Sequence, residues 1–290
     1  MTQPKLSLII SFYNKTDLLQ RVLESVALQT LQDFEVVIAD DGSGEEAVAK
    51  VKQMQQTFAF PIVHVWQEDN GWQKTKILNK AVVAAHAEYL VFIDGDCLLE
   101  RHFLEEHYAA RKAGEVVTGR RVMLTEETTK SLLAAPIKAD SFGIRLFLRL
   151  LWATVFKKQK TQMEQMIRLP YWLRRYLIKE RKRYILGCNF SLYKSDLLSV
   201  NGFDERFAYP GYGEDIDLEF RLARKGIVAM SRKCQLVEFH CYHKHFDTDY
   251  VPNKQLLQAN NNQGITYTLY GIQSVSCQYE GNHTSNSYFS

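Results

Sequence analysis

Two carboxylates follow an apolar run in the first third of the chain. The run YLVFI (89–93) leads directly into Asp94-Gly95-Asp96. Carboxylates two residues apart suit a hard divalent cation and leave coordination positions open for phosphate oxygens. An isolated string of this kind also occurs as ordinary turn chemistry. Its place after a predicted strand favours the metal interpretation.

A second acidic group contains Glu214, Asp215 and Asp217. It follows the glycines of GYG (211–213) and precedes the helix-like run LEFRLARKG. Capping and the helix dipole explain acids at a helix N-terminus, at about 1 kcal/mol each. That explanation accounts less well for the glycines, which let a substrate approach the backbone closely. A carboxylate in this place can accept a proton from an attacking hydroxyl, which is general-base chemistry.

Three imidazoles lie within six residues, at His240, His243 and His245, just after the strand-like run QLVEF. This density favours contact with a metal or a phosphate over a purely structural role. Cys241 inside the cluster raises a zinc site as the alternative. The sequence disfavours zinc, because no second cysteine or compact four-ligand set is nearby.

The elements that must position these groups alternate over the first hundred residues. Buried strands are predicted at 6–11, 34–39, 62–66 and 89–93, and helical apolar spacing occurs at 17–29, 45–56 and 74–87. This order predicts an α/β fold with a mostly parallel sheet and helices on both faces.

Polar residues follow each of the four predicted strands, at Asn14, at Asp40 with Asp41, at Asn70 with Gly71, and at Asp94 with Asp96. Ligands of open parallel sheets bind at the carboxyl ends of the strands. Turn chemistry explains any one of these clusters, and explains all four together poorly. The sequence therefore predicts that they converge on one crevice.

The composition limits the class of protein. With 290 residues, 46% of them hydrophobic, the chain is long enough for one large or two small domains with a real core. A net charge of +3 gives no argument for nucleic acid. Five cysteines without a CxxC pair favour free thiols in a reducing compartment. The first apolar run is too short for a signal peptide, and no run approaches the ~18 residues of a spanning helix, so we expect a cytoplasmic protein.

The segment 141–184 differs in character from the rest. Its first part, 141–156, is rich in Leu, Phe and Trp, and 157–183 interleaves Lys and Arg with aromatic residues. This pattern is typical of a membrane-surface segment and suits an acceptor carried on a lipid. The alternative is a pair of helices packed on the core with a solvated basic face. From residue 260 onward the chain is polar.

Taken together, the motifs resemble glycosyltransferase family 2, the inverting enzymes with the GT-A fold. The matching strings, in order, are SLIISFYN, VVIADDGS, DNGWQKTKILNKAV, YLVFIDGDCL, GCNFSLYKSDLLSVNGFDERF and PGYGEDIDLEFRL. They cover roughly residues 5–100 and 185–255. The later half also resembles the galactosyltransferase-type C-terminal segment shared with animal β-1,4-galactosyltransferases and chondroitin-type polymerases.

The resemblance implies a donor and an acceptor. The donor is a UDP-sugar, and a hexose or N-acetylhexosamine passes to a hydroxyl of a cell-surface glycan or lipid-linked oligosaccharide, as in lipopolysaccharide, capsule or exopolysaccharide assembly. It also implies three parts: a nucleotide-sugar half at 1–115, an acceptor and catalytic half at 116–255 with a helical insert at 141–184, and a polar tail at 256–290.

The resemblance also implies residue roles. The donor-binding positions are Phe12, Tyr13, Asn14, Asp40, Asp41, Gly71, Lys74, Lys76, Asn79, Asp94 and Gly95. The ligands of Mn²⁺ or Mg²⁺ are Asp96, Asp94, His243 and His240. Asp215 stands where the family places its catalytic base, and Glu214 where it contacts the acceptor or the donor sugar. One departure is Leu78, where many relatives carry arginine, and Lys74 or Lys76 is expected to take over its contact.

Two other classes are weighed against this one. A nucleotidyltransferase also combines a Rossmann-like sheet with metal carboxylates, but it needs a glycine- and lysine-rich phosphate loop, and SFYNKTD is not one. A non-catalytic sugar-nucleotide or glycan-binding module is expected to lose the DGD or GED carboxylates, and both are present.

Overall fold

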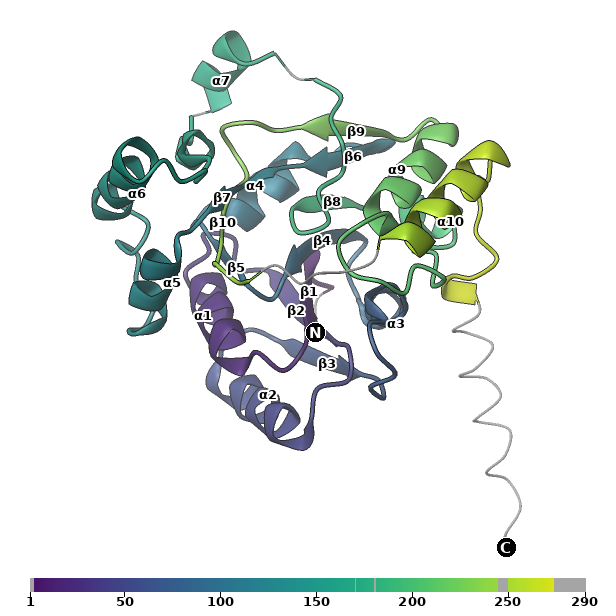
Figure 1. Cartoon of the computed structure of the whole chain (residues 1–290), viewed down its shortest axis with the longest axis horizontal. Helices are drawn as coiled ribbons and strands as arrows, with labels where there is room; N and C mark the ends of the chain where they lie inside the picture. Colours follow the sequence, from purple (N-terminus) through teal and green to yellow (C-terminus); the bar gives the residue numbers. More distant parts are fainter. Residues whose placement is uncertain (1–2, 170, 180, 245–249, 274–290) are drawn as a thin grey trace, which may run out of the picture.

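The computed structural model describes residues 3–169, 171–179, 181–244 and 250–273 (Figure 1). The strands are β1 (Leu6–Phe12), β2 (Phe34–Asp40), β3 (Ile62–Trp66), β4 (Tyr89–Asp94), β5 (Cys97–Leu99), β6 (Glu115–Thr118), β7 (Arg120–Met123), β8 (Phe190–Tyr193), β9 (Val228–Ser231) and β10 (Val237–His240). The helices are α1 (Thr16–Ala27), α2 (Glu45–Thr57), α3 (Lys74–Ala84), α4 (Phe103–Ala110), α5 (Glu126–Leu133), α6 (Ile144–Phe156), the 3₁₀ helix η1 (Met163–Met166), α7 (Tyr171–Leu177), α8 (Lys194–Ser199), α9 (Glu214–Arg224) and α10 (Val251–Asn262).

The main sheet has the strand order β3-β2-β1-β4-β8-β6-β9. Strands β1 to β4 are mutually parallel, whereas β8 runs antiparallel to both β4 and β6. The mostly parallel α/β sheet predicted from the sequence is therefore confirmed. The helix predicted to reach Ala87 ends at Ala84, because Ala85 turns to an extended conformation.

Two hydrophobic layers cover the two faces of this sheet. Alternate residues of β1 point to opposite faces, so Leu8 and Ile10 pack with α1 and α2, while Ile9 packs with α3 and α9. Both layers are continuous across β4 and β8. Strands β1 to β4 of the predicted donor half thus share one sheet with β6, β8 and β9.

The strand register brings the predicted polar clusters together. Ser11 pairs with Asp94, and Phe12 pairs with Asp40, so the polar ends of β1, β2 and β4 lie side by side. The small sheet β5-β10-β7 adds the histidine segment. In that sheet His240 of β10 pairs with Cys97 of β5, the residue that follows Asp96 in the chain.

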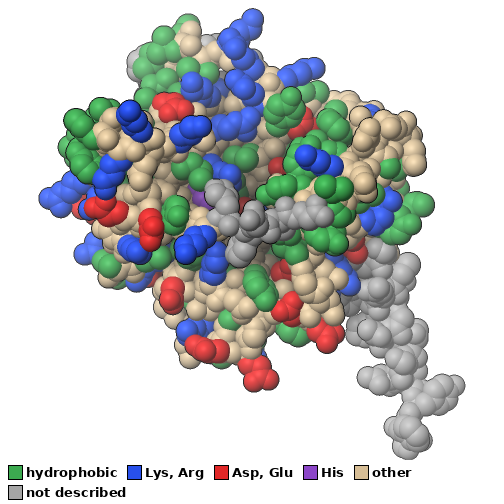
Figure 2. All heavy atoms as spheres, viewed as in Figure 1, with side chains coloured by type: hydrophobic (Ala, Val, Ile, Leu, Met, Phe, Trp, Pro, Cys, Tyr) green, Lys and Arg blue, Asp and Glu red, His purple; other side chains and the backbone are tan. Residues whose placement is uncertain are grey.

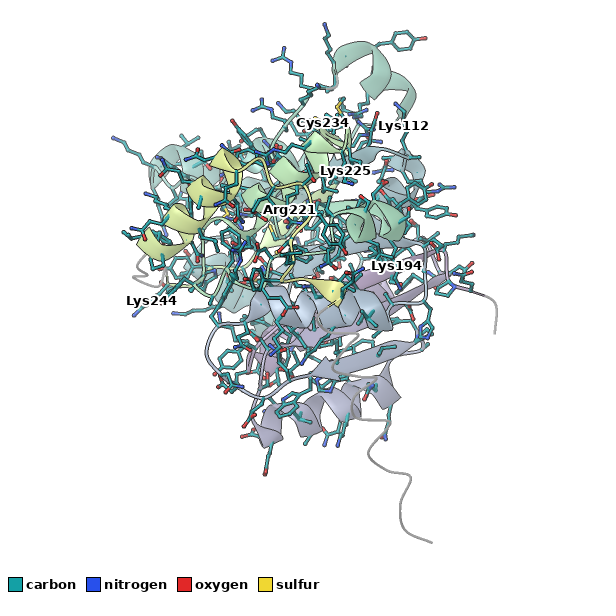
Figure 3. All side chains as sticks on the ribbon, turned by 90° about the vertical axis from the view of Figure 1, so that its right-hand side faces the viewer. Lys112, Lys194, Arg221, Lys225, Cys234 and Lys244 are labelled. Carbon is teal, nitrogen blue, oxygen red and sulfur yellow. The ribbon has the colours of Figure 1, made fainter. Side chains whose placement is uncertain are left out.

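Helices α9 and α10 pack together on the side of the molecule seen in Figure 3. Arg221 of α9, labelled there, is fully buried, and its Nε donates to Asp217 Oδ2 at 2.7 Å. Asn260 of α10 donates to Asp217 Oδ1 at 2.8 Å. Helix α10 crosses the predicted boundary at residues 255 and 256. Leu257, Asn260 and Ile272 are buried, so this part of the predicted tail is packed on the fold.

The predicted insert 141–184 contains α6, η1 and α7. In Figure 1 α6 lies at the left of the molecule and α7 at its top. The attachment of the insert to the core includes a stacked ring pair, Phe142 on Phe239, with centroids 4.6 Å apart. In the part of the chain that the structure describes, no helix has the length and apolar character needed to cross a membrane.

Candidate active site

A cleft of about 390 Å³ opens at the carboxyl ends of β1, β2 and β4. Ten of the predicted site residues line it: Phe12, Tyr13, Asp41, Gly71, Lys74, Asp94, Gly95, Asp96, His240 and His243. They come from strand ends, from the start of α3 and from the segment after β10. The convergence expected at the strand ends is therefore present in the structure.

Asp94 sits on the floor of the cleft with two donors. Its Oδ1 accepts hydrogen bonds from Ser11 Oγ at 2.7 Å and from Lys74 Nζ at 2.6 Å. Burial opposes the charge of Asp94, but the Lys74 ammonium and the Ser11 hydroxyl outweigh it and hold the pKa of Asp94 at about 2. The same pairing raises the pKa of Lys74 against the effect of its own burial. Both groups are therefore charged at neutral pH.

Asp96 meets two imidazoles. The Nε2 atoms of His240 and His243 lie 3.6 Å from Oδ1 and Oδ2 of Asp96, respectively. Ligand atoms bound ~2.1 Å from one ion lie about 3–3.5 Å apart, so each histidine lies near the spacing of a ligand beside Asp96. The compact ligand group among the described residues contains Asp96, Cys97 and His240, and His243 lies outside it. Burial lowers the pKa of His240, which favours the neutral imidazole that binds metals. Its Nδ1 is buried and has no protein partner among the described residues.

Gly95 between the two aspartates is required by close packing. A Cβ at this position would lie 2.7 Å from the carbonyl oxygen of Ser11, which also accepts the Gly95 N–H at 2.8 Å. A larger residue would push the loop away from β1. The glycine thus holds both carboxylates of the motif at the strand end.

Glu214 and Asp215 begin α9, and both interact electrostatically with Lys74. Burial raises the pKa of Glu214 to about 7, with Asp215 adding to the shift and Lys74 opposing it. Burial also raises the pKa of Asp215, whose Oδ2 accepts the Gly187 N–H at 3.3 Å. The Oε2 of Glu214 is buried and has no partner within the described ranges. Neither acid lines the cleft. Both interact electrostatically with Lys74, which does line it.

The glycines before α9 have a backbone role. Gly211 and Gly213 adopt φ values of +92° and +109°, which non-glycine residues avoid. A Cβ on Gly213 would also lie 2.8 Å from the ring of Phe207. The tight turn explains these glycines without a substrate at the backbone, and it aims the first two acids of α9 toward Lys74.

Two of the predicted donor residues brace the loop instead of facing the cleft. Asp40 is fully buried and binds the Ser43 N–H and His64 Nε2, both at 2.8 Å. Asn14, at φ +57°, accepts the Gly44 N–H at 3.0 Å. Of the Asp40 and Asp41 pair, it is therefore Asp41 that lines the cleft.

Asp41 is held in place by its neighbours. Its two oxygens accept hydrogen bonds from Gln67 Nε2 at 2.6 Å and from the Gln73 N–H at 2.9 Å. Burial nevertheless raises its pKa. The backbone N–H of Asp41 bonds to the carbonyl of Phe12 at 3.0 Å, so the first two strand ends are tied together here.

Two predicted positions on α3 lie away from the cleft lining. Asn79 is fully buried, donating to the Phe203 carbonyl at 2.9 Å and accepting the Phe203 N–H at 2.9 Å. Lys76 is half-buried and is not among the residues that line the cleft. Of the two lysines expected to replace the missing arginine, Lys74 is the one placed at the cleft, because it begins the helix.

Six further residues line the cleft and were missed by sequence reasoning: Ser11, Lys15, Ala39, Asp69, Trp72 and Ile77. Asp69 and Trp72 flank Gly71 in the string DNGWQ, so proximity to a predicted residue was the available signal. Tyr13 Oη donates to Asp69 Oδ2 at 2.9 Å, which closes the loop over one side of the cleft.

The cysteine inside the histidine cluster, Cys241, is not part of a metal-ligand group, whereas Cys97 forms one with Asp96 and His240 among the described residues. Cys97 and Cys188 form a buried group with Glu238, in which Cys188 Sγ donates to Glu238 Oε1 at 3.1 Å. The third imidazole of the cluster, His245, lies outside the described residues.

Comparisons with known proteins agree with this geometry. The model of glycosyl transferase family 2 matches residues 7–183, and that described as the N-terminal domain of galactosyltransferase matches residues 171–245. A mannosyltransferase from Pyrobaculum calidifontis, solved with GDP-Man and Mn²⁺, superposes with a TM-score of 0.54 at 15% identity, covering 99% of this chain and 77% of its own. Staphylococcus aureus TarS superposes at 0.53 with 15% identity, covering 88% and 39%.

Two curated relatives match most of this chain. A validoxylamine A glucosyltransferase of Streptomyces hygroscopicus subsp. jinggangensis is 30% identical over 81% of this chain and 55% of its own length. An Escherichia coli chondroitin synthase is 25% identical over 76% of this chain and 32% of its own. The chain thus spans about half the length of the Streptomyces relative, and less of the synthase.

The mostly parallel sheet and the likeness to the two solved structures show the GT-A fold. Because the family model covers more than half of its residues, the chain belongs to glycosyltransferase family 2.

Proposed function

We propose that this protein transfers a hexose or N-acetylhexosamine from a UDP-sugar to an acceptor hydroxyl, with inversion at the anomeric carbon. One observation carries the proposal. Lys74 bonds to Asp94 at the donor cleft and is electrostatically coupled to the buried acids Glu214 and Asp215. In this proposal the diphosphate site and the general base both lie beside the Lys74 ammonium group.

The donor occupies the cleft in this proposal. Asp41 accepts from the donor's ribose or base, beside the aromatic side chains of Phe12, Tyr13 and Trp72, which line the same cleft. Asn14 and Asp40 hold the loop that carries them, through the bonds described above. The proposed base is uracil, as the family resemblance implies, and relatives named as a glucosyltransferase and a chondroitin synthase support sugar transfer as the reaction.

Asp96, His240 and His243 would hold a divalent cation, Mn²⁺ or Mg²⁺. Asp94 is the fourth proposed ligand, although its Oδ1 already binds Lys74 and Ser11. A bound cation supplies positive charge to the diphosphate of the leaving nucleotide. The Lys74 ammonium contributes charge of the same sign from the protein itself, next to the place where the leaving-group charge develops.

Asp215 is the proposed general base. It removes the proton of the acceptor hydroxyl while the hydroxyl oxygen bonds to C1 and the bond from C1 to the diphosphate oxygen breaks. The proton stays on Asp215 and the electron pair leaves with UDP, so no covalent intermediate is needed and an α-linked donor gives a β-linked product. Glu214, buried beside it, would bind a hydroxyl of the acceptor or of the donor sugar.

The acceptor is proposed to be a cell-surface glycan or a lipid-linked oligosaccharide. In this proposal residues 1–115 bind the donor, and 116–255 supply the acceptor site and the base. The four cysteines within the described residues are free and buried, which supports the proposal of a reducing, cytoplasmic location.

The test is release of UDP from a panel of UDP-sugars in the presence of Mn²⁺. Slow hydrolysis of one donor is expected, lost on addition of EDTA and in Asp96→Ala and Asp215→Asn. The active donor is then incubated with a cell-surface glycan fragment as acceptor, and NMR of the product gives the anomeric configuration of the transferred sugar. A retained configuration, or release that EDTA leaves unchanged, would contradict the proposal.

A further inference from the structure

Helix α6 is apolar both on the face that packs against the protein and on the face turned to solvent. Leu146, Leu150 and Ala153 are buried against the core. The outer face carries Ile144, Leu148, Leu151, Trp152, Val155 and Phe156, which are between 37% and 72% exposed. A helix that is apolar all round is normally covered on all sides. The described residues cover only one side of α6.

The exposure is concentrated in this part of the chain. Twenty large apolar or aromatic side chains are exposed among the described residues, and ten of them lie in the insert 141–184. Beyond α6 these are Ile167, Tyr176, Leu177 and Tyr184. Single exposed apolar side chains are normal on any surface, whereas a contiguous group marks an interaction site.

The charge around α6 is predominantly basic, although Glu127 of α5 pairs with Lys157 at 3.1 Å and acids stand at positions 140 and 164, just outside the stretch. The stretch 141–163 contains five Lys and Arg residues, no Asp and no Glu. Arg145 and Arg149 are exposed along one edge of the apolar face, one helical turn apart. Lys157 lies at the end of α6, with its Nζ 4.6 Å from the ring centre of Trp152. Figure 2 shows hydrophobic side chains with Lys and Arg beside them at the edge where Figure 1 places α6.

Apolar side chains with a basic border match the interface of a membrane that contains anionic lipids. The apolar groups enter the boundary between headgroups and acyl chains, and the basic groups meet the lipid phosphates. The 13 residues of α6 are about 20 Å long, too short to span a bilayer, so the helix must lie along the surface. A second copy of the chain is disfavoured as the occupant, because facing copies would bring the basic residues of both helices together.

We propose that α6 docks this protein on a membrane surface rich in anionic lipid, with the side chains of Leu148, Trp152 and Phe156 inserted. This proposal deepens the proposed function, since it places the enzyme where a lipid-linked acceptor is presented. Only the presence of a lipid-linked acceptor at that surface depends on the proposed function. The docking itself stands on the composition and exposure of α6.

Vesicle flotation of the full chain tests the proposal. Vesicles of phosphatidylcholine alone are compared with vesicles that contain phosphatidylglycerol in addition. We expect the wild type to float with the mixed vesicles, with a partition coefficient roughly tenfold above that for the neutral ones, and to lose this difference in high salt. Equal partition into both kinds, or none into either, would overturn the proposal.

Variants locate the contact. The triple variant Leu148→Gln/Trp152→Gln/Phe156→Gln is expected to lose at least about tenfold in partition. The matched control Val83→Gln/Leu198→Gln/Leu269→Gln replaces three exposed apolar residues elsewhere and is expected to bind as the wild type does. Arg145→Gln/Arg149→Gln is expected to reduce only the binding that depends on phosphatidylglycerol. Undiminished binding of the α6 triple variant would contradict the assignment.

Two further readouts separate the possible failures. Sedimentation velocity measures self-association; a dimer that dissociates in the α6 triple variant, without vesicle binding by the wild type, would assign the face to a second copy. Calorimetry with UDP and Mn²⁺ measures the donor site, which the α6 variants are expected to leave unchanged. Vesicle binding without UDP binding would overturn the proposed function alone, and UDP binding without vesicle binding would overturn the docking alone.

Discussion

The acids at the start of helix α9 lie in two environments that differ in hydrogen bonding and in their effect on the carboxylate charge. Asp217 faces the interior, where Arg221 and Asn260 satisfy both of its oxygens at 2.7 and 2.8 Å. Glu214 and Asp215, one turn earlier, face Lys74, and burial raises the pKa of both. Three acids within four residues thus divide into one structural carboxylate and two that are costly to charge.

The difference teaches how to separate stability from function in an acidic motif. A buried carboxylate with full hydrogen bonding stabilises packing and has no capacity left for a substrate. Glu214 has a buried oxygen without a partner among the described residues, and Asp215 accepts only backbone N–H groups. Buried carboxylates with raised pKa values are costly to charge, and such groups gather at functional sites. The capping explanation therefore describes Asp217 poorly, since its partners are side chains, and it leaves the raised pKa values of the first two acids unexplained.

The largest effect is expected when the proposed base is neutralised. Asp215→Asn keeps the size of the side chain but removes its capacity to take a proton, so kcat should fall roughly 10²–10⁴-fold. The melting temperature should stay near that of the wild type, because the pKa shift shows that the charge is not stabilising. Steady-state kinetics with the best UDP-sugar, together with a thermal melt, measures both. A loss of less than about threefold in kcat would remove Asp215 from this role.

The structural acid should show the reverse pattern. Arg221→Met leaves the Asp217 charge buried without its partner, so the free energy of unfolding should drop by about 3–5 kcal/mol. UDP affinity of the folded fraction should not change. Urea unfolding measures the loss, and the double variant Asp217→Asn/Arg221→Met should recover part of it. A single variant as stable as the wild type would mean that the network does not hold α9.

The pH dependence of the wild type should report the acid pair. A base must be deprotonated to act, and a raised pKa keeps it protonated up to a higher pH. The pKa of Glu214 is about 7 and that of Asp215 is raised above its ordinary value. The rate should therefore fall, by about tenfold per unit, on the acid side of the pKa of the carboxylate that limits the reaction. The profile of kcat/KM measures this. A flat profile down to pH 5 would show that neither carboxylate limits the reaction.

A smaller effect is expected from removing the ammonium between the two regions of the site. Lys74 lowers the pKa of both Glu214 and Asp215, so Lys74→Met should move the acidic limb of the profile to higher pH by about one unit. Lys76→Met on the same helix is the matched control and should leave the limb in place. A shift toward lower pH in Lys74→Met would contradict the electrostatic account.

Much of the fold was predictable because its signals are local. The strands that end in Phe12, Asp40 and Asp94 are short apolar runs, and their parallel order follows from the alternation of strands with helices. Parallel order then dictates that their polar ends meet. For the same reason, the cleft contains most of the donor residues named from the sequence.

What the sequence left open depends on side-chain direction and on distant partners. Asp40 and Asp41 are neighbours of the same type, yet one bonds to His64 and the other lines the cleft, and no local pattern separates them. Asn79 was expected to bind the donor, whereas the structure bonds it to Phe203, 124 positions along the chain. The packed part of α10 was missed because its buried residues are largely polar, such as Asn253 and Asn260.

The most direct test of the account is calorimetric binding of UDP to the wild type, Asp96→Ala and Asp215→Asn, each with Mn²⁺ and with EDTA. The account predicts metal-dependent binding that Asp96→Ala abolishes and Asp215→Asn retains in full, because the first residue belongs to the donor cleft and the second to the base. UDP binding that is unchanged by EDTA and by Asp96→Ala would contradict the account. So would the absence of UDP binding by the wild type under every condition.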